Sequence, residues 1–201
     1  MKSRAYRQEA RARAAADNTQ RIIDAALELF LQRPFDHVTL NAVAERAGVG
    51  LQSVIRRVGT KDGLAAMVDE WIGPQVAATL GDPATVTGAA DLANRFCAHH
   101  ERWGLLIERT LHQSDVSPVI AANAERGRVA HREWVVAACA DALAAVDGGA
   151  RRRLTARLVA VTGVEVFQTL RRDEGLSLAD THAALTDLVS GCLTATASEK
   201  P

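Results

Sequence analysis

The stretch TLNAVAERAGVGLQSVIRRVGTK, residues 39–61, limits the fold of this chain more than any other segment. Its small and apolar residues recur at helical spacing on both sides of Gly48, which predicts two short helices packed across each other. Gly48 stands at the corner between them, where a glycine adopts a positive φ at little cost. Thr39 directly precedes the first apolar helical residue and suits an N-cap. The segment therefore predicts a helix-turn-helix.

The second helix of this pair carries hydrogen-bonding side chains that suit a nucleic acid. Gln52 and Ser53 lie at its start, and glutamine matches the major-groove edge of adenine. We expect these two residues to contact base edges, Arg56 to read guanine and Arg57 to bind phosphate. A helical hairpin that only packs, with solvated arginines, is the alternative.

The front of the chain is basic. Through residue 67 there are 11 basic and 7 acidic residues, although the whole chain has 24 of each, so the remainder is acidic. This mild asymmetry is expected if only the front meets a polyanion. Residues 1–17 have no apolar stripe, and we expect a flexible arm whose Arg4 and Arg7 reach phosphates or a minor groove on DNA.

The rest of the pattern is helical. Hydrophobic residues make up 48% of the 201 positions and aromatics only 4%, which suits an all-α protein. The first helix is expected from Asn18 or Thr19 to Gln32, and it completes a three-helix head. The later helices are expected at these places: Lys61–Leu80 with a kink or end at Gly73–Pro74, Ala89–His112 with Gly104 as a candidate break, Ser117 to about Val146, Arg151–Arg172, and from Leu176–Ser177 onward.

Residues 21–64, RIIDAALELFLQRPFDHVTLNAVAERAGVGLQSVIRRVGTKDGL, resemble the head of the TetR (tetracycline-repressor) family of bacterial transcriptional regulators. All parts of the family pattern have matching residues: Ile23, Ala25, Ala26, Leu29 and Phe30 in the first helix, Thr39, Val43, Ala44, Ala47, Gly48 and Val49 through the corner, and Thr60, Lys61 and Leu64 at the exit. Four positions depart. Gly50 replaces a capping serine, Ile55 replaces a tyrosine that commonly touches phosphate, and Arg57-Val58 replaces His-Phe.

The resemblance implies an all-α chain of about nine helices. Its parts would be the basic arm over 1–17, a DNA-binding head over 18–64, and a ligand-binding and dimerisation domain over 65–201. Thr39 would bind one phosphate, and Lys61 another at the start of the fourth helix. In the family that helix transmits ligand binding to the head, so a kink at Gly73–Pro74 would be a hinge, and a static proline kink is the alternative.

Apolar stripes on two faces of residues 151–172 need cover on both sides, which predicts a partner chain. In the TetR family the last two helices of each subunit form a four-helix bundle across a two-fold axis, and the last helices of this chain are similar in layout. The expected homodimer interface residues are Leu158, Val161, Val166, Leu170, Leu185, Leu188 and Val189.

A small apolar or amphipathic effector is the expected ligand of the body. The residues expected to line its pocket are Trp71, Phe96, His100, Trp103, Trp134 and Phe167, with His131 as an alternative polar contact. An ordinary place in the core is the alternative for each. His99, His100, Glu108 and His112 suggest a metal site less well than solvated or capped side chains, so we expect no metal or other cofactor.

Other classes of protein find little support. The sequence has no GxGxxG, P-loop, HExxH or GxSxG motif, so we do not expect an enzyme. Cys97, Cys139 and Cys192 lack zinc-ligand spacing and are expected as buried thiols. Without an apolar leader or a run of about 18 apolar residues, we expect a cytoplasmic protein with no membrane partner.

The sequence therefore predicts a dimeric, ligand-responsive transcriptional regulator, a repressor by default. It would bind a palindromic operator in double-stranded DNA and leave it when an effector binds. The alternative is a helical protein-interaction module whose head does not bind DNA specifically.

Overall fold

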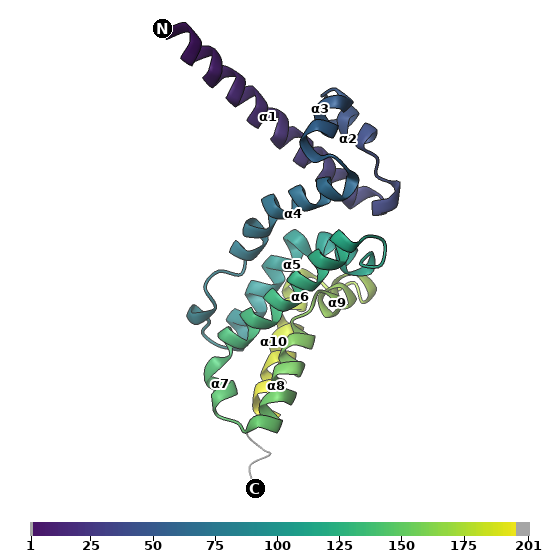
Figure 1. Cartoon of the computed structure of the whole chain (residues 1–201). Helices are drawn as coiled ribbons and strands as arrows, with labels where there is room; N and C mark the ends of the chain where they lie inside the picture. The colour runs from purple at the N-terminus through teal and green to yellow at the C-terminus, as the bar shows by residue number, and fades with distance from the viewer. Residues whose placement is uncertain (1, 196–201) are drawn as a thin grey trace. The chain divides into compact units, whose positions relative to one another are not determined.

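The computed structural model describes residues 2–195, and these are helical with no strand (Figure 1). The expected all-α fold with an N-terminal helix-turn-helix head is confirmed. The chain divides into two compact units, residues up to Pro74 together with Arg109–Asn123, and Gln75–Glu108 together with the residues from Ala124 onward. We call the first unit the head unit and the second the body. The expected division at residue 64 stays a prediction.

Helix α1 (Lys2–Gln32) begins earlier than expected. Its N-terminal half extends beyond the α2–α3 pair in Figure 1. The sequence prediction of a start at Asn18 or Thr19 is wrong, because a run of alanines sustains a helix without any apolar stripe. Arg57 Nη2 also donates to Ala15 O over 3.1 Å, which ties this part of α1 to the head. The flexibility of residues 1–17 in solution stays a prediction.

The head unit continues with η1 (Phe35–His37), α2 (Leu40–Ala47), α3 (Leu51–Val58) and α4 (Lys61–Ala78). Its core joins the apolar stripe of α1 to the inner faces of the other helices, with these buried residues: Ile22, Ile23, Ala26, Leu29, Val38, Val43, Ala44, Ala47, Val54, Leu64 and Val68. Two of these buried residues on α2, Ala44 and Ala47, are small. The three-helix head thus has the architecture that its periodicity predicted.

The segment 109–123 belongs to the head unit although it is far from the head in sequence. Phe35 N donates to Gln113 Oε1 over 2.5 Å, and Ile120 packs with Phe35 and Ala65. Ser117 has the expected capping role, since its Oγ accepts from Val119 N. The same hydroxyl donates to Asp62 Oδ1 over 2.8 Å, which joins this segment to the start of α4.

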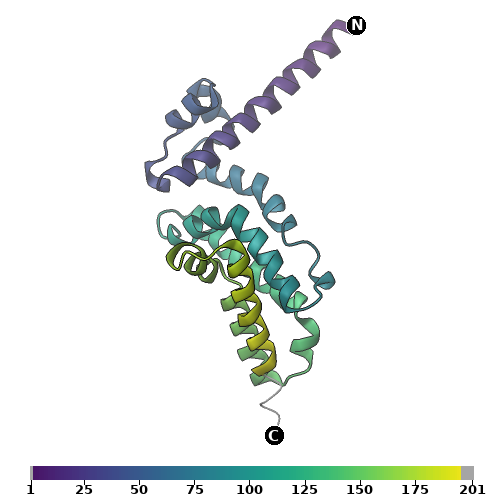
Figure 2. The same ribbon diagram turned by 180° about the vertical axis from the view of Figure 1, so that it is seen from behind.

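The helices of the body complete the chain: η2 (Pro83–Thr85), α5 (Ala89–His112), α6 (Pro118–Ala138), α7 (Ala140–Ala144), α8 (Gly148–Val161), α9 (Val164–Gln168), η3 (Thr169–Asp173) and α10 (Leu178–Ala195). Helices α8 and α10 run side by side (Figure 2). Helix α4 passes through Pro74 instead of ending there, and the two units divide at this residue.

Three helix boundaries in the body differ from expectation. Helix α5 is unbroken at Gly104, where a Cβ would approach Gln168 Nε2 to 3.2 Å, so the glycine serves close packing instead of a break. Helix α6 ends at Ala138 and not near Val146. The expected helix over residues 151–172 is divided at Thr162–Gly163, because Gly163 takes an extended conformation (φ −69°, ψ 155°) as the N-cap of α9.

Candidate functional site

The corner of the helix-turn-helix is built from one glycine and one arginine. Gly48 has φ 63° and ψ 39°, the left-handed conformation that the sequence predicted. The guanidinium of Arg21, on α1, donates to the carbonyls of Ala47 and Gly48, the latter over 2.7 Å. These carbonyls end α2 and have no partner in the helix itself. Sequence reasoning missed Arg21, since nothing local links a residue of α1 to a helix end 26 positions later.

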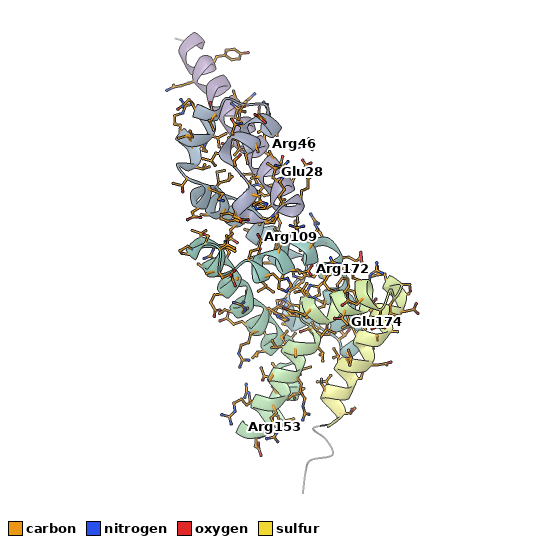
Figure 3. The ribbon with its side chains drawn as sticks, turned by 90° about the vertical axis from the view of Figure 1, so that its right-hand side faces the viewer. Glu28, Arg46, Arg109, Arg153, Arg172 and Glu174 are labelled. Carbon is orange, nitrogen blue, oxygen red and sulfur yellow. The ribbon has the colours of Figure 1, made fainter. Side chains whose placement is uncertain are left out.

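A second contact holds α2 on α1. Arg46 Nε donates to Glu28 Oε2 over 2.7 Å, and Figure 3 shows the two side chains directed toward each other. The bond from Arg46 lowers the pKa of the Glu28 carboxyl. Thr39 caps the other end of α2, because its hydroxyl accepts from Ala42 N over 3.1 Å. The helix that precedes the corner is therefore fixed at both ends.

Helix α3 presents a polar face away from this core. Val54 is fully buried, whereas Gln52 and Arg56 are exposed and Ser53 is half-buried. Among the described residues, the side chains of Gln52, Ser53 and Arg56 have no hydrogen-bond partner within the chain, so their polar groups are available to an external ligand. Their roles in base reading stay predictions.

Two of the expected phosphate contacts have bonds inside the head unit. Lys61 Nζ donates to Phe35 O and Asp36 O over 3.0 and 3.1 Å, and it lies 4.6 Å from the centroid of the Phe35 ring. Two of the three donors of the ammonium are thus used in the fold. Arg57 likewise uses one of its N–H donors in the head unit, because its Nη2 donates to Ala15 O. The side chains of Arg4 and Arg7 lie outside the described part of the chain.

Several expected pocket residues meet in one aromatic cluster in the body. Phe96 is its centre, with ring centroids 5.7 Å from His100, 5.3 Å from His131 and 5.4 Å from Trp134. Phe167 joins it at 5.4 Å from His100. Trp71 is not part of this cluster, because it packs against the core of the head unit.

The histidines of the cluster hold the break between α8 and α9. His100 Nε2 lies 2.9 Å from Thr162 O, and His131 Nε2 lies 2.9 Å from Thr162 Oγ1. Burial lowers the pKa of His100 to about 3 and that of His99 to about 4, and it also lowers the pKa of His131. All three rings are therefore neutral near pH 7. Neither Thr162 nor His99 was identified as part of this arrangement from the sequence.

The expected interface residues separate into two groups. Leu158, Leu185 and Val189 are at most 2% exposed within one subunit, so their side chains belong to its own core. Val161, Leu170 and Leu188 instead line an open groove of about 620 Å³ on α8, η3 and α10. Val166 is half-buried beside Phe167. The residues of the groove are the ones that a partner chain could reach, and the interface itself stays a prediction.

Residues 2–195 show neither the geometry of a metal site nor that of a membrane span. No group of three or more His, Cys, Asp or Glu residues in this range has the arrangement of a metal site. Within the same range no helix has the length and hydropathy of a membrane span. The three cysteines are buried and free, and burial raises the pKa of Cys97 to about 11.

Comparisons with known proteins agree with this geometry. Residues 22–68 match the model of the bacterial regulatory proteins of the tetR family. No curated protein matches the sequence. Among solved structures, the complex of SmeT with triclosan has a TM-score of 0.62 at 19% identity, over 89% of this chain and 90% of that chain. The multidrug binding protein EbrR complexed with imidazole has a TM-score of 0.56 at 23% identity, over 84% of this chain and 88% of that chain.

Proposed function

We propose that this protein is a homodimeric, ligand-responsive transcriptional repressor, because residues 22–68 match the tetR family model and 89% of the chain shares its fold with SmeT. Two heads on a two-fold axis would read the half-sites of a palindromic operator about 34–36 Å apart. An effector bound in the body would favour a spacing of the heads that does not fit DNA. A differential affinity of about 1–3 kcal/mol changes operator affinity about 5- to 150-fold.

One observation supports DNA binding above all. The exposed face of α3 offers Gln52, Ser53 and Arg56 with no partner in the described part of the chain, while α2 and the corner are fixed by Thr39 and Arg21. Binding is efficient when the contacting groups are held in place before the ligand arrives, since less ordering entropy is lost. A helix that reads bases needs a fixed position and polar side chains that are available to the DNA, and α3 has both features.

Binding of the full-length protein to DNA tests the proposal. An operator selected from random duplexes should bind more tightly than random duplex, and affinity should fall by about 0.9 log units per log unit of salt for each phosphate contact. Gln52→Ala and Arg56→Ala should each weaken operator binding by about 1–3 kcal/mol and leave random duplex unchanged. Arg57→Ala should weaken binding to every duplex equally, because its contact is to phosphate.

Arg46→Ala is the matched arginine control. Its guanidinium is already paired with Glu28, so its loss should leave operator affinity unchanged once the folded fraction is accounted for. Equal losses on all sequences for Gln52→Ala and Arg56→Ala would make those residues phosphate contacts only. No salt-dependent binding to any duplex would favour the protein-interaction module instead.

The ligand response rests on the fold and on two structural neighbours. SmeT and EbrR have this fold and were solved with triclosan and imidazole. We propose that the body of this chain also holds a small apolar or amphipathic effector, with Phe96, His100 and Phe167 among its contacts. Screening small molecules for release of the bound operator tests this part, and a compound that binds the protein without weakening the DNA complex would argue against coupling.

A further inference from the structure

Two buried polar atoms on the part of α5 that belongs to the body have no hydrogen-bond partner among the described residues, His100 Nδ1 and Trp103 Nε1. Their side chains are only 5% and 9% exposed. Residues three apart on a helix are neighbours on its surface, so both residues lie on the buried face of α5. Buried polar groups in folded proteins nearly always have partners, so these two atoms call for a partner from outside the chain, either a ligand or water. The third such atom, Arg109 Nε, belongs to the head unit.

The chemistry of the two atoms is complementary. Thr162 O can only accept, so His100 Nε2 carries the proton and donates over 2.9 Å. Since the ring is neutral near pH 7, Nδ1 is a bare acceptor. Trp103 Nε1–H can only donate. A hydroxyl group satisfies both, because it donates one proton and accepts another.

The surroundings favour a flat, uncharged molecule. The His100 ring stacks on Phe96 with the planes 29° apart, and Phe167 lies 5.4 Å from it. Phe96 and Phe167 are buried. The adjacent histidines are neutral near pH 7, so an ion brought among them would lose its hydration without gaining a counter-ion there. Arg102, whose guanidinium lies 4.7 Å from the centroid of the Trp103 ring, is the one charge to be tested as a rival anchor.

We propose that His100 and Trp103 form the polar end of an effector site for an uncharged aromatic hydroxyl compound. The hydroxyl of the ligand donates to His100 Nδ1 and accepts from Trp103 Nε1, and its ring lies against Phe96 and Phe167. Trp134 has no such role, because its Nε1 already donates to Gly81 O over 2.9 Å. The inference rests on the proposed effector response, but it is tested without DNA, so its failure leaves the DNA-binding proposal standing.

Four probes separate the possible anchors: phenol, anisole, toluene and benzoate. We expect calorimetry on the full-length protein at pH 7 to show phenol binding at least about tenfold more tightly than toluene, since only phenol satisfies both atoms. Anisole accepts but does not donate, and it should fall between them. The indole N–H resonance of Trp103, assigned from its loss in Trp103→Phe, should move downfield with phenol and anisole, as a hydrogen-bonded N–H does, and toluene should cause no downfield shift.

The variant Trp103→Phe keeps an aromatic ring and removes only the donor. In it the preference for anisole over toluene should disappear, and the preference for phenol should fall several-fold. His182→Asn is the control, because His182 Nε2 bonds Ala90 O elsewhere in the body, and all four affinities should be unchanged. The comparison of probes on the unaltered chain decides the question even if the variant does not fold.

Three results would overturn the inference. Equal affinity for phenol and toluene would mean an apolar cavity with no polar anchor. Tighter binding of benzoate than of phenol would make Arg102 the anchor. Binding of none of the four probes, with the Trp103 resonance unmoved, would mean that buried water satisfies both atoms.

Discussion

Gly48 and Arg21 show how much of the head depends on single residues. The carbonyls that end α2 need donors, and the Arg21 guanidinium supplies them from α1. A Cβ at residue 48 would lie 2.7 Å from Arg21 Nη2, so any other residue there would make the guanidinium shift from its present position. The positive φ and the space for Arg21 are two separate demands that one glycine meets.

Gly50 is the natural comparison for Gly48, because it is the N-cap of α3 with φ −70°, and a Cβ at this residue would have no heavy atom within 4 Å. Gly48→Ser should lower the free energy of unfolding of the head by about 1–2 kcal/mol, since it places a side chain in the left-handed conformation. Gly50→Ser should raise it by about a few tenths of a kcal/mol, since a serine hydroxyl can cap α3. Urea unfolding followed by circular dichroism measures both. Equal effects of the two serines would contradict this account of the corner.

At the scale of the element, the break between α8 and α9 is the feature that most changes the body. The helix ends at Thr162, so the carbonyl of this residue has no partner within the helix. Both the carbonyl and the buried hydroxyl of Thr162 nevertheless have hydrogen-bond partners. His100 donates to the carbonyl, and His131 donates to the hydroxyl, which itself donates to Leu158 O over 2.7 Å. Residues from α5 and α6 thus stabilise the end of α8.

These buried neutral histidines make stability depend on pH. Their pKa values are lowered in the folded chain, to about 4 for His99 and about 3 for His100, while the ordinary value is 6.5. Below pH 6.5 the unfolded chain therefore binds protons that the folded chain does not. The free energy of unfolding should fall as pH is lowered from 6.5 to 5, with a slope approaching about 1.4 kcal/mol per pH unit for each histidine.

Urea unfolding between pH 7 and pH 5 measures this slope in a window where carboxylates change little. His131→Gln keeps a donor for Thr162 Oγ1 but cannot take up a proton, so the slope should be smaller in this variant. A stability that is flat across this window would show that folding does not lower the pKa values of these histidines. A slope that His131→Gln does not change would show the same for His131 alone.

At the scale of the whole molecule, the groove on α8, η3 and α10 is the surface on which the proposed dimer depends. The groove combines Val161, Leu170 and Leu188 with the charges of Arg157 and Asp187 at its sides. Leu188 is 41% exposed, although it lies on the same helix as the fully buried Val189. In the proposed dimer a second copy of this surface covers it, and each subunit then meets one operator half-site.

Two exposed leucines on α10 allow a matched test of the dimer. Leu188 lines the groove, whereas Leu178, 45% exposed at the start of the helix, does not. Leu188→Glu should convert the protein to a monomer, because it places a carboxylate in an apolar interface beside Asp187. Sedimentation equilibrium measures this, and operator affinity should fall with it. Leu178→Glu should remain dimeric, and a dimer that survives Leu188→Glu would place the interface elsewhere.

The sequence by itself determined the helices of the head and their order. Caps, the corner glycine and the spacing of apolar residues act within a few positions, so Thr39, Gly48 and the buried face of α3 could be predicted. The resemblance to a known family extended this to the fold class.

Only the tertiary structure decided which partners those residues meet. It assigned Lys61 to the carbonyls of η1, Arg21 to the end of α2, and the polar groups of Thr162 to His100 and His131. It also separated Leu158 in the core from Leu188 at the surface. An apolar stripe indicates that one face of a helix is covered. The cover can come from the same subunit or from a second chain, and the pattern is identical in both cases. Contacts between residues far apart in sequence make that choice, and no local pattern records them.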